Sequence, residues 1–249
     1  MYTGTVTFSA RIKGNGLTFS LIEFNPQEPG VDKVEIEGRN GDRNGNEILS
    51  TVHLASVATR EAGKALATKV NTAALNRISF LHSIVIEDDT ITGGQLVLVD
   101  PPPGTVELEG TSLTLAGGAV GLLHGISAVS LKAELEQSSP PGEHYYGLLR
   151  SARQSLSPVE EFVHVYNLLL MLYNNHFADV EAFILSKDPA VPQTRSPHNP
   201  KLMETVYTRL RHELAHARAG VNLDSTKAEM TKRVSELIAL TKQAIKSQP

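Results

Sequence analysis

Polar and hydrophobic positions alternate through much of the first half of the chain, a spacing that predicts β-strands. The alternating or β-branched runs lie at 4–12, 17–24, 31–37, 49–57, 83–91, 95–99 and 105–115. One segment, 60–81, differs because its apolar side chains recur every three or four positions, and Thr59 before it is a suitable helix cap. Residues 1–138 are therefore predicted to form a strand-rich α+β domain with one long helix.

A polar, proline-rich segment at 137–142 is the best candidate for a linker, and beyond it the strand pattern stops. Residues 143–249 are predicted to form a helical bundle. Its helical segments are 143–156, one from Pro158, 178–185, 200–219, and one from near Asp224 or Thr226 to about 245. The helix from Pro158 has the clearest start, because Ser157 and Glu160 form a capping box. It is apolar on nearly all sides from Val165 onward, which is typical of a bundle centre.

The composition limits the possible chemistry. There is no cysteine among the 249 residues, which excludes disulfides, thiolate metal sites and cysteine nucleophiles. The net charge of −4 is uneven, since residues 1–138 carry 10 Lys and Arg against 16 Asp and Glu, whereas residues 139–249 carry 13 against 11. A mildly basic second half is compatible with an RNA partner without requiring one. The start lacks a secretory pattern and the densest apolar run, 168–172, is too short for a bilayer, so we expect a cytoplasmic protein with no membrane partner.

The segment Arg-His-Glu-Leu-Ala-His, at 211–216, carries the candidate chemistry and supports two interpretations. As H-E-x-x-H, it places His212 and His216 one helical turn apart, as in the metal-binding helix of zinc peptidases. Zinc would then need a third ligand, for which Glu236 is the candidate, and Glu213 would act as the base. Neighbouring arginines oppose this interpretation, because cations near a dication weaken its binding.

The second interpretation pairs Arg211 with His216 as an R-x4-H motif. Helical spacing places His212 and His216 close together on the side opposite an apolar stripe, with Arg211 at the edge of the same polar side. The stripe consists of Leu202, Met203, Val206, Tyr207, Leu210 and Leu214. The sequence from Tyr207 to His216 resembles the late-helix motif of HEPN domains. The segment 220–230 is similar to the C-terminus of the MauJ type, a family linked to methylamine utilisation that joins a strand-rich region to a HEPN-like bundle.

The resemblance implies a homodimer in which the 200–219 helices of two copies face each other and share a metal-independent ribonuclease site, with no cofactor. His216 would position or deprotonate the RNA 2′-OH, Arg211 would clamp the phosphate, and His212 would orient the substrate or protonate the leaving group. We further expect RNA contacts from Tyr207, Arg209 and Arg218. Two alternatives stay open, a non-catalytic accessory protein of the MauJ type and a zinc-dependent hydrolase.

Overall fold

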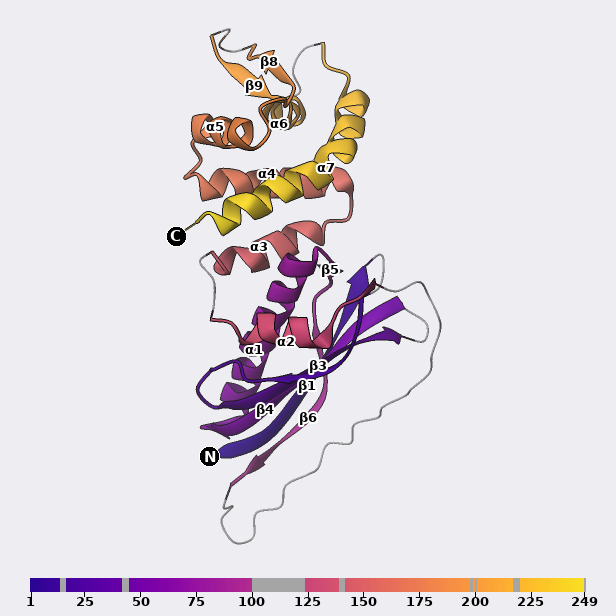
Figure 1. The fold of residues 1–249 in the computed structure, drawn as a ribbon, viewed down its shortest axis with the longest axis vertical. Helices are drawn as coiled ribbons and strands as arrows, with labels where there is room; N and C mark the ends of the chain where they lie inside the picture. The colour runs from indigo at the N-terminus through magenta and orange to yellow at the C-terminus, as the bar shows by residue number, and fades with distance from the viewer. Residues whose placement is uncertain are drawn as a thin grey trace. The chain divides into compact units, whose positions relative to one another are not determined.

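The computed structural model describes residues 1–13, 17–41, 45–99, 124–138, 142–197, 199, 201–216 and 220–248. The chain divides into two compact units, Met1–Pro140 and Pro141–Pro249. The first unit is built on a β-sheet and the second is mainly helical (Figure 1). The predicted α+β class, with a strand-rich first part, is therefore confirmed.

The first unit contains one sheet of seven strands among the described residues. The strands are β1 (Tyr2–Lys13), β2 (Leu17–Phe24), β3 (Val31–Gly41), β4 (Gly45–Val57), β5 (Val85–Ile86), β6 (Thr90–Leu98) and β7 (His124–Gly125). Their order is β5-β1-β4-β3-β2-β7, and β6 pairs with β1 alongside β5. The β2–β7 pair is parallel and the other pairs are antiparallel.

The two helices of this unit, α1 (Arg60–His82) and α2 (Ala128–Glu136), share one hydrophobic core with the sheet. The alternation in β1 supplies that core, since its buried side chains come from every second position. These are Val6, Phe8, Ala10 and Ile12. At the start of α1, the Thr59 hydroxyl accepts a hydrogen bond from the Ala62 amide at 3.0 Å, which confirms the predicted cap.

Helix α2 was not predicted, and a long-range contact helps to hold it. The buried Arg77 of α1 donates from Nη1 to the carbonyl oxygens of Glu134, Leu135 and Gln137 at 3.1, 3.1 and 2.9 Å. These carbonyls lie at the end of α2, where the helix itself offers no donors. The predicted strand at 83–91 is also wrong in extent, because β5 and β6 are separate strands that both pair with β1. The predicted strand at 105–115 lies outside the described residues.

The second unit contains five helices and a short hairpin in its described part. They are α3 (His144–Arg153), α4 (Pro158–Leu172), α5 (Phe177–Lys187), β8 (Gln193–Arg195), β9 (Met203–Thr205), α6 (Val206–His216) and α7 (Leu223–Lys246). Helix α4 lies at the centre, as predicted, in contact with α3, α5, α6 and α7. Its start is also confirmed, since the Glu160 amide donates to the Ser157 hydroxyl at 3.2 Å. Helix α7 begins earlier than predicted, because Asn222 rather than Asp224 or Thr226 is its cap.

No helix in the described ranges is long and apolar enough to span a bilayer.

Candidate functional site

Helix α6 carries the R-x4-H segment. It begins at Val206, six residues after the predicted start at residue 200. The residues before it are extended, because Met203, Glu204 and Thr205 pair with Arg195, Thr194 and Gln193 in the β8–β9 hairpin. The predicted apolar stripe is correspondingly shorter. Val206, Tyr207 and Leu210 are buried, whereas Leu202 and Met203 are 57% and 47% exposed.

A buried polar network fixes the start of α6 to α4 and α5. The Glu181 carboxylate of α5 accepts hydrogen bonds from the Thr205 amide at 2.8 Å and from the Thr205 and Thr208 hydroxyls. The Tyr166 hydroxyl of α4 contacts the Thr208 hydroxyl at 2.6 Å. Burial raises the pKa of the Glu181 carboxyl above its usual value, and the three hydrogen bonds act in the opposite direction. These contacts hold the first turn of α6 and therefore position the face that follows.

The structure brings Arg211, His212 and His216 together on that face, and we call these three residues the Arg–His cluster. The imidazole rings of His212 and His216 are 5.9 Å apart between centroids. Phe177, at the start of α5, lies beside them, with its ring 5.2 Å from that of His212 and 5.9 Å from the Arg211 guanidinium carbon. His216 is exposed, and Arg211 and His212 are half-buried. The Arg211 guanidinium and the His212 imidazole thus lie beside the same Phe177 ring, and the His216 imidazole lies beside that of His212.

Glu204 holds one of these imidazoles and was not predicted as a site residue. Its carboxylate Oε1 lies 3.3 Å from His212 Nδ1, and the Glu204 side chain is only 9% exposed. An ionised carboxylate only accepts hydrogen bonds, so Nδ1 of His212 is the donor in this contact. Neither Glu204 nor Phe177 has a local sequence signal, because β9 and α5 bring them to the cluster only in the folded chain.

Two of the residues predicted to contact RNA point elsewhere. Arg209 forms ion pairs with Glu213 at 2.8 Å and with Glu229 of α7 at 2.6 Å. Tyr207 is buried, and its hydroxyl donates to the Glu236 carboxylate at 3.1 Å. The third, Arg218, lies outside the described residues.

The two carboxylates of the zinc alternative also have other partners. Glu213 is buried, with Oε1 bonded to Arg209 and Oε2 bonded to the Thr226 hydroxyl, each at 2.8 Å. Glu236 bonds Arg233 at 2.9 Å as well as Tyr207. Within the described ranges, no group of three or more His, Asp or Glu side chains is placed to hold a metal ion.

Comparison with known proteins gives no assignment: no family model, curated protein or solved structure matches the chain. The HEPN resemblance therefore rests on the motif and on the order of the helical segments.

Proposed function

We propose that the chain is a HEPN-type, metal-independent ribonuclease that acts through the Arg–His cluster as a homodimer. One observation carries the proposal. A guanidinium and two imidazoles share a surface, and a buried carboxylate fixes one of the imidazoles. RNA is a suitable substrate for such a set because its own 2′-OH is the nucleophile. The protein then needs to move protons and to stabilise charge on the phosphate.

The reaction assigns one role to each member of the cluster. His216 accepts the proton of the 2′-OH as the oxygen attacks the adjacent phosphorus. The bond from phosphorus to the 5′-oxygen breaks, and His212 donates a proton to that oxygen. The products are a 2′,3′-cyclic phosphate and a free 5′-OH. Arg211 donates hydrogen bonds to the phosphate oxygens as negative charge increases on them.

The contact between His212 and Glu204 supports the acid role of His212. A carboxylate beside an imidazole orients the ring and stabilises the imidazolium that the acid role requires. His216 has an exposed ring and can approach a ribose hydroxyl from solvent. Each proton transfer typically contributes about 10²–10⁴ in rate. Glu204 acts in this scheme as a positioning residue.

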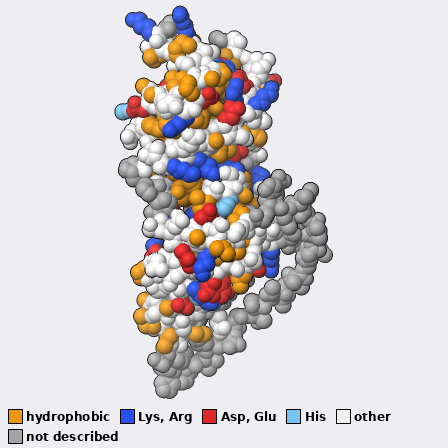
Figure 2. Space-filling model, in the orientation of Figure 1, with side chains coloured by type: hydrophobic (Ala, Val, Ile, Leu, Met, Phe, Trp, Pro, Cys, Tyr) orange, Lys and Arg blue, Asp and Glu red, His pale blue; other side chains and the backbone are white. Residues whose placement is uncertain are grey.

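The surface around the cluster supports a homodimer. Phe177 touches the cluster and is 39% exposed, and Leu202 and Met203, just before Glu204 in the chain, are also exposed. Figure 2 shows hydrophobic side chains at the surface over α5 and the β8–β9 hairpin. In a two-fold dimer the same patch occurs on both copies, so these apolar side chains and the two clusters would meet at the axis. The proposal includes a cytoplasmic location, where the protein would meet cellular RNA.

The test is an RNA cleavage assay in EDTA on a random-sequence RNA pool, with product ends identified chemically. We expect cyclic phosphate ends and a loss of about 10²-fold or more for Arg211→Ala and for His216→Ala. Arg233→Ala on α7 and His164→Ala on α4 are the matched controls, because each removes a side chain of the same type that lies on none of α5, α6 and the β8–β9 hairpin. Cleavage that survives both cluster variants contradicts the mechanism.

The oligomeric state provides a second, independent measurement. We expect a dimer in solution by light scattering. RNA cleavage by a strict monomer would contradict the shared site, because a single chain would then perform the whole reaction. A dimer that cleaves no member of the RNA pool would instead favour the non-catalytic accessory role.

A further inference from the structure

Phe177 is exposed beside the Arg–His cluster, although the other phenylalanines of the chain are buried. The sequence has seven phenylalanines, and the structure describes all of them. Six are at most 9% exposed, whereas Phe177 is 39% exposed. An aromatic ring in water loses the free energy that its burial would provide. The exposure of this one ring, at the candidate site, therefore indicates a contact with a ligand.

Helix α5 holds the ring against α6. Phe177 and Glu181 are four positions apart, so they lie on one face of α5. Glu181 accepts hydrogen bonds from Thr205 and Thr208 at the start of α6. One turn further along α6, the rings of Phe177 and His212 are 5.2 Å apart. The two helices thus meet at successive turns, which restricts the position of the ring before a substrate binds.

The groups beside the ring are those that the proposed reaction uses. The Arg211 guanidinium carbon lies 5.9 Å from the ring centre, and the plane of the His212 ring is tilted from the Phe177 plane by 52°. Arg211 would hold the cleaved phosphate and His212 would protonate the 5′-oxygen. A bound RNA therefore brings a ribose and its base next to Phe177. Every nucleobase has an aromatic face, and aromatic side chains hold unpaired bases by stacking on it.

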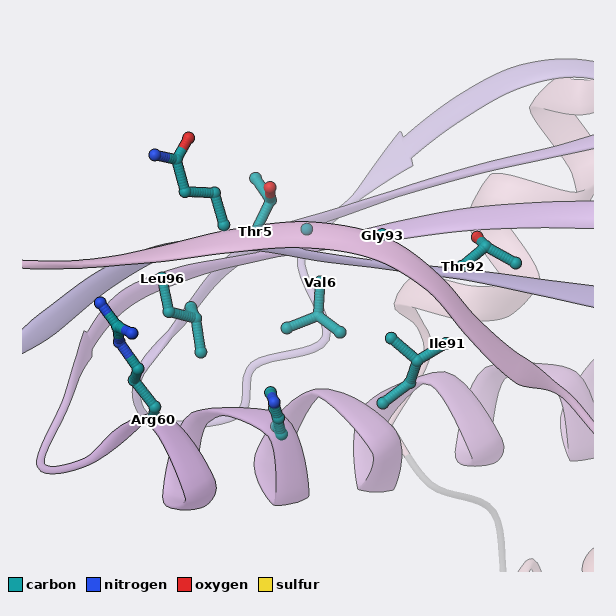
Figure 3. Close-up of a pocket in the computed structure, with 10 residues that line it drawn as sticks. Thr5, Val6, Arg60, Ile91, Thr92, Gly93 and Leu96 are labelled. Atoms are coloured by element: carbon teal, nitrogen blue, oxygen red, sulfur yellow. The ribbon is translucent and has the colours of Figure 1, made fainter. Parts of the chain in front are cut away.

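A hollow of about 410 Å³ in the first unit differs from this surface (Figure 3). It lies between β6 and α1, where Val6 and Leu96 point toward α1 and are only 3% and 8% exposed. Among the described residues that line it, none is aromatic. The exposed Phe177 ring is therefore the better candidate for a contact with a ligand.

We propose that Phe177 is a specificity-determining residue whose ring stacks on an unpaired base next to the cleaved phosphate. The proposal rests on the ribonuclease function of the Arg–His cluster and adds the substrate class, an RNA that is single-stranded at the cleavage site. In a duplex the neighbouring base pairs cover both faces of each base, so no base can stack on the ring. In the homodimer the ring would line the shared cleft, and Leu202 and Met203 would supply the contact between the copies.

The test uses single-stranded RNA oligonucleotides in which every ribose except one carries a 2′-O-methyl group, so that only one phosphate can be attacked. All four bases are tried on each side of that phosphate. KM and kcat are measured in EDTA with the full-length protein.

The central variant is Phe177→Leu, which keeps an apolar side chain and removes the aromatic ring. It should raise KM by about tenfold, because stacking on one base is lost. The value of kcat should stay near that of wild type, since stacking holds the substrate and the transition state alike. Phe177→Trp keeps an aromatic ring and should have a KM near that of wild type. Leu148→Ala, which changes a 46% exposed leucine of α3, is the control and should leave KM unchanged.

An abasic residue beside the attacked phosphate separates stacking from a structural effect. With wild type, the abasic residue that removes the stacked base should raise KM as much as Phe177→Leu does. The variant should lose little more on that strand, because the contact is already absent. Annealing an intact oligonucleotide to its complement should reduce its cleavage by wild type.

Three results would overturn the stacking role while the ribonuclease function stands. They are a KM that Phe177→Leu leaves unchanged, additive losses from the variant and the abasic residue, and a duplex that is cut as fast as the single strand. A Phe177→Leu protein that is monomeric by light scattering would also overturn it, because the ring would then be a contact between copies. If wild type cuts none of the oligonucleotides and no member of the RNA pool, the ribonuclease function fails and the stacking role fails with it.

Discussion

Replacing Glu213 by alanine distinguishes a structural carboxylate from a catalytic one. The variant removes two hydrogen bonds of 2.8 Å, from Arg209 and from the Thr226 hydroxyl, at a side chain that is 10% exposed. Neither donor is left without an acceptor, because Arg209 keeps Glu229 and Thr226 keeps the Asn222 carbonyl oxygen at 3.3 Å. We therefore expect a loss of about 2 kcal/mol in the free energy of unfolding, within the usual range for a buried charged partner.

The matched variant is Glu229→Ala, which removes the other carboxylate on Arg209. Its side chain is 36% exposed, so its pair is screened by water and the loss should stay below about 1 kcal/mol. Urea unfolding of the full-length protein gives both free energies, and hydrogen exchange at α6 and α7 amides shows whether the loss falls there. RNA cleavage below the unfolding transition should match wild type for Glu213→Ala. Unchanged stability together with lost cleavage would refute this reasoning and make Glu213 part of the chemistry.

Three further variants test the backbone and the charge of the fold. Gly4→Ala should lower the free energy of unfolding by about 3 kcal/mol or more, because φ is +140° and the new Cβ would overlap the Gln95 carbonyl oxygen. Gly220→Ala is the matched variant, since Gly220 has φ of +80° but open space around it. It should lose about 1 kcal/mol in the same urea titration. Burial and nearby cations lower the pKa of Lys242 to about 8. Between about pH 8 and pH 10.5 the folded chain has therefore released a proton that the unfolded chain still binds. The free energy of unfolding should rise with pH across this window. Lys242→Met should flatten this rise and add less than about 1 kcal/mol near pH 7, since the amine is half-buried; an unchanged pH profile would contradict the assignment.

Elements with local signals were the ones that the sequence predicted well. Strand β2 was predicted with its observed bounds, and the caps at Thr59 and Ser157 form the expected hydrogen bonds. In each case neighbouring residues supply the determining interaction. Helix α2 was missed although Ser127 caps it, because its nine residues carry only two buried leucines. The buried Arg77 that holds its end lies far away in the chain.

The candidate site was predictable only in part, for the same physical reason. Spacing alone places His212 and His216 together on a helix, and the structure has them so. Spacing does not show that residues 203–205 pair with 193–195 instead of continuing the helix, and this pairing is what places Glu204. Arg209 and Arg211 are likewise equivalent in sequence. They differ in the fold because Arg209 lies against the acids Glu213 and Glu229, and Arg211 lies over Phe177.

The carboxylates around the two histidines provide a physical argument about mechanism. A base that activates a metal-bound water needs an oxygen directed at that water, and both oxygens of Glu213 are bonded within the bundle. Freeing either oxygen would require breaking a contact that joins Glu213 to its own helix or to α7. The carboxylate that does touch an imidazole is Glu204, which contacts His212 from β9. A carboxylate in that position orients the His212 imidazole, which the proposed proton transfer requires.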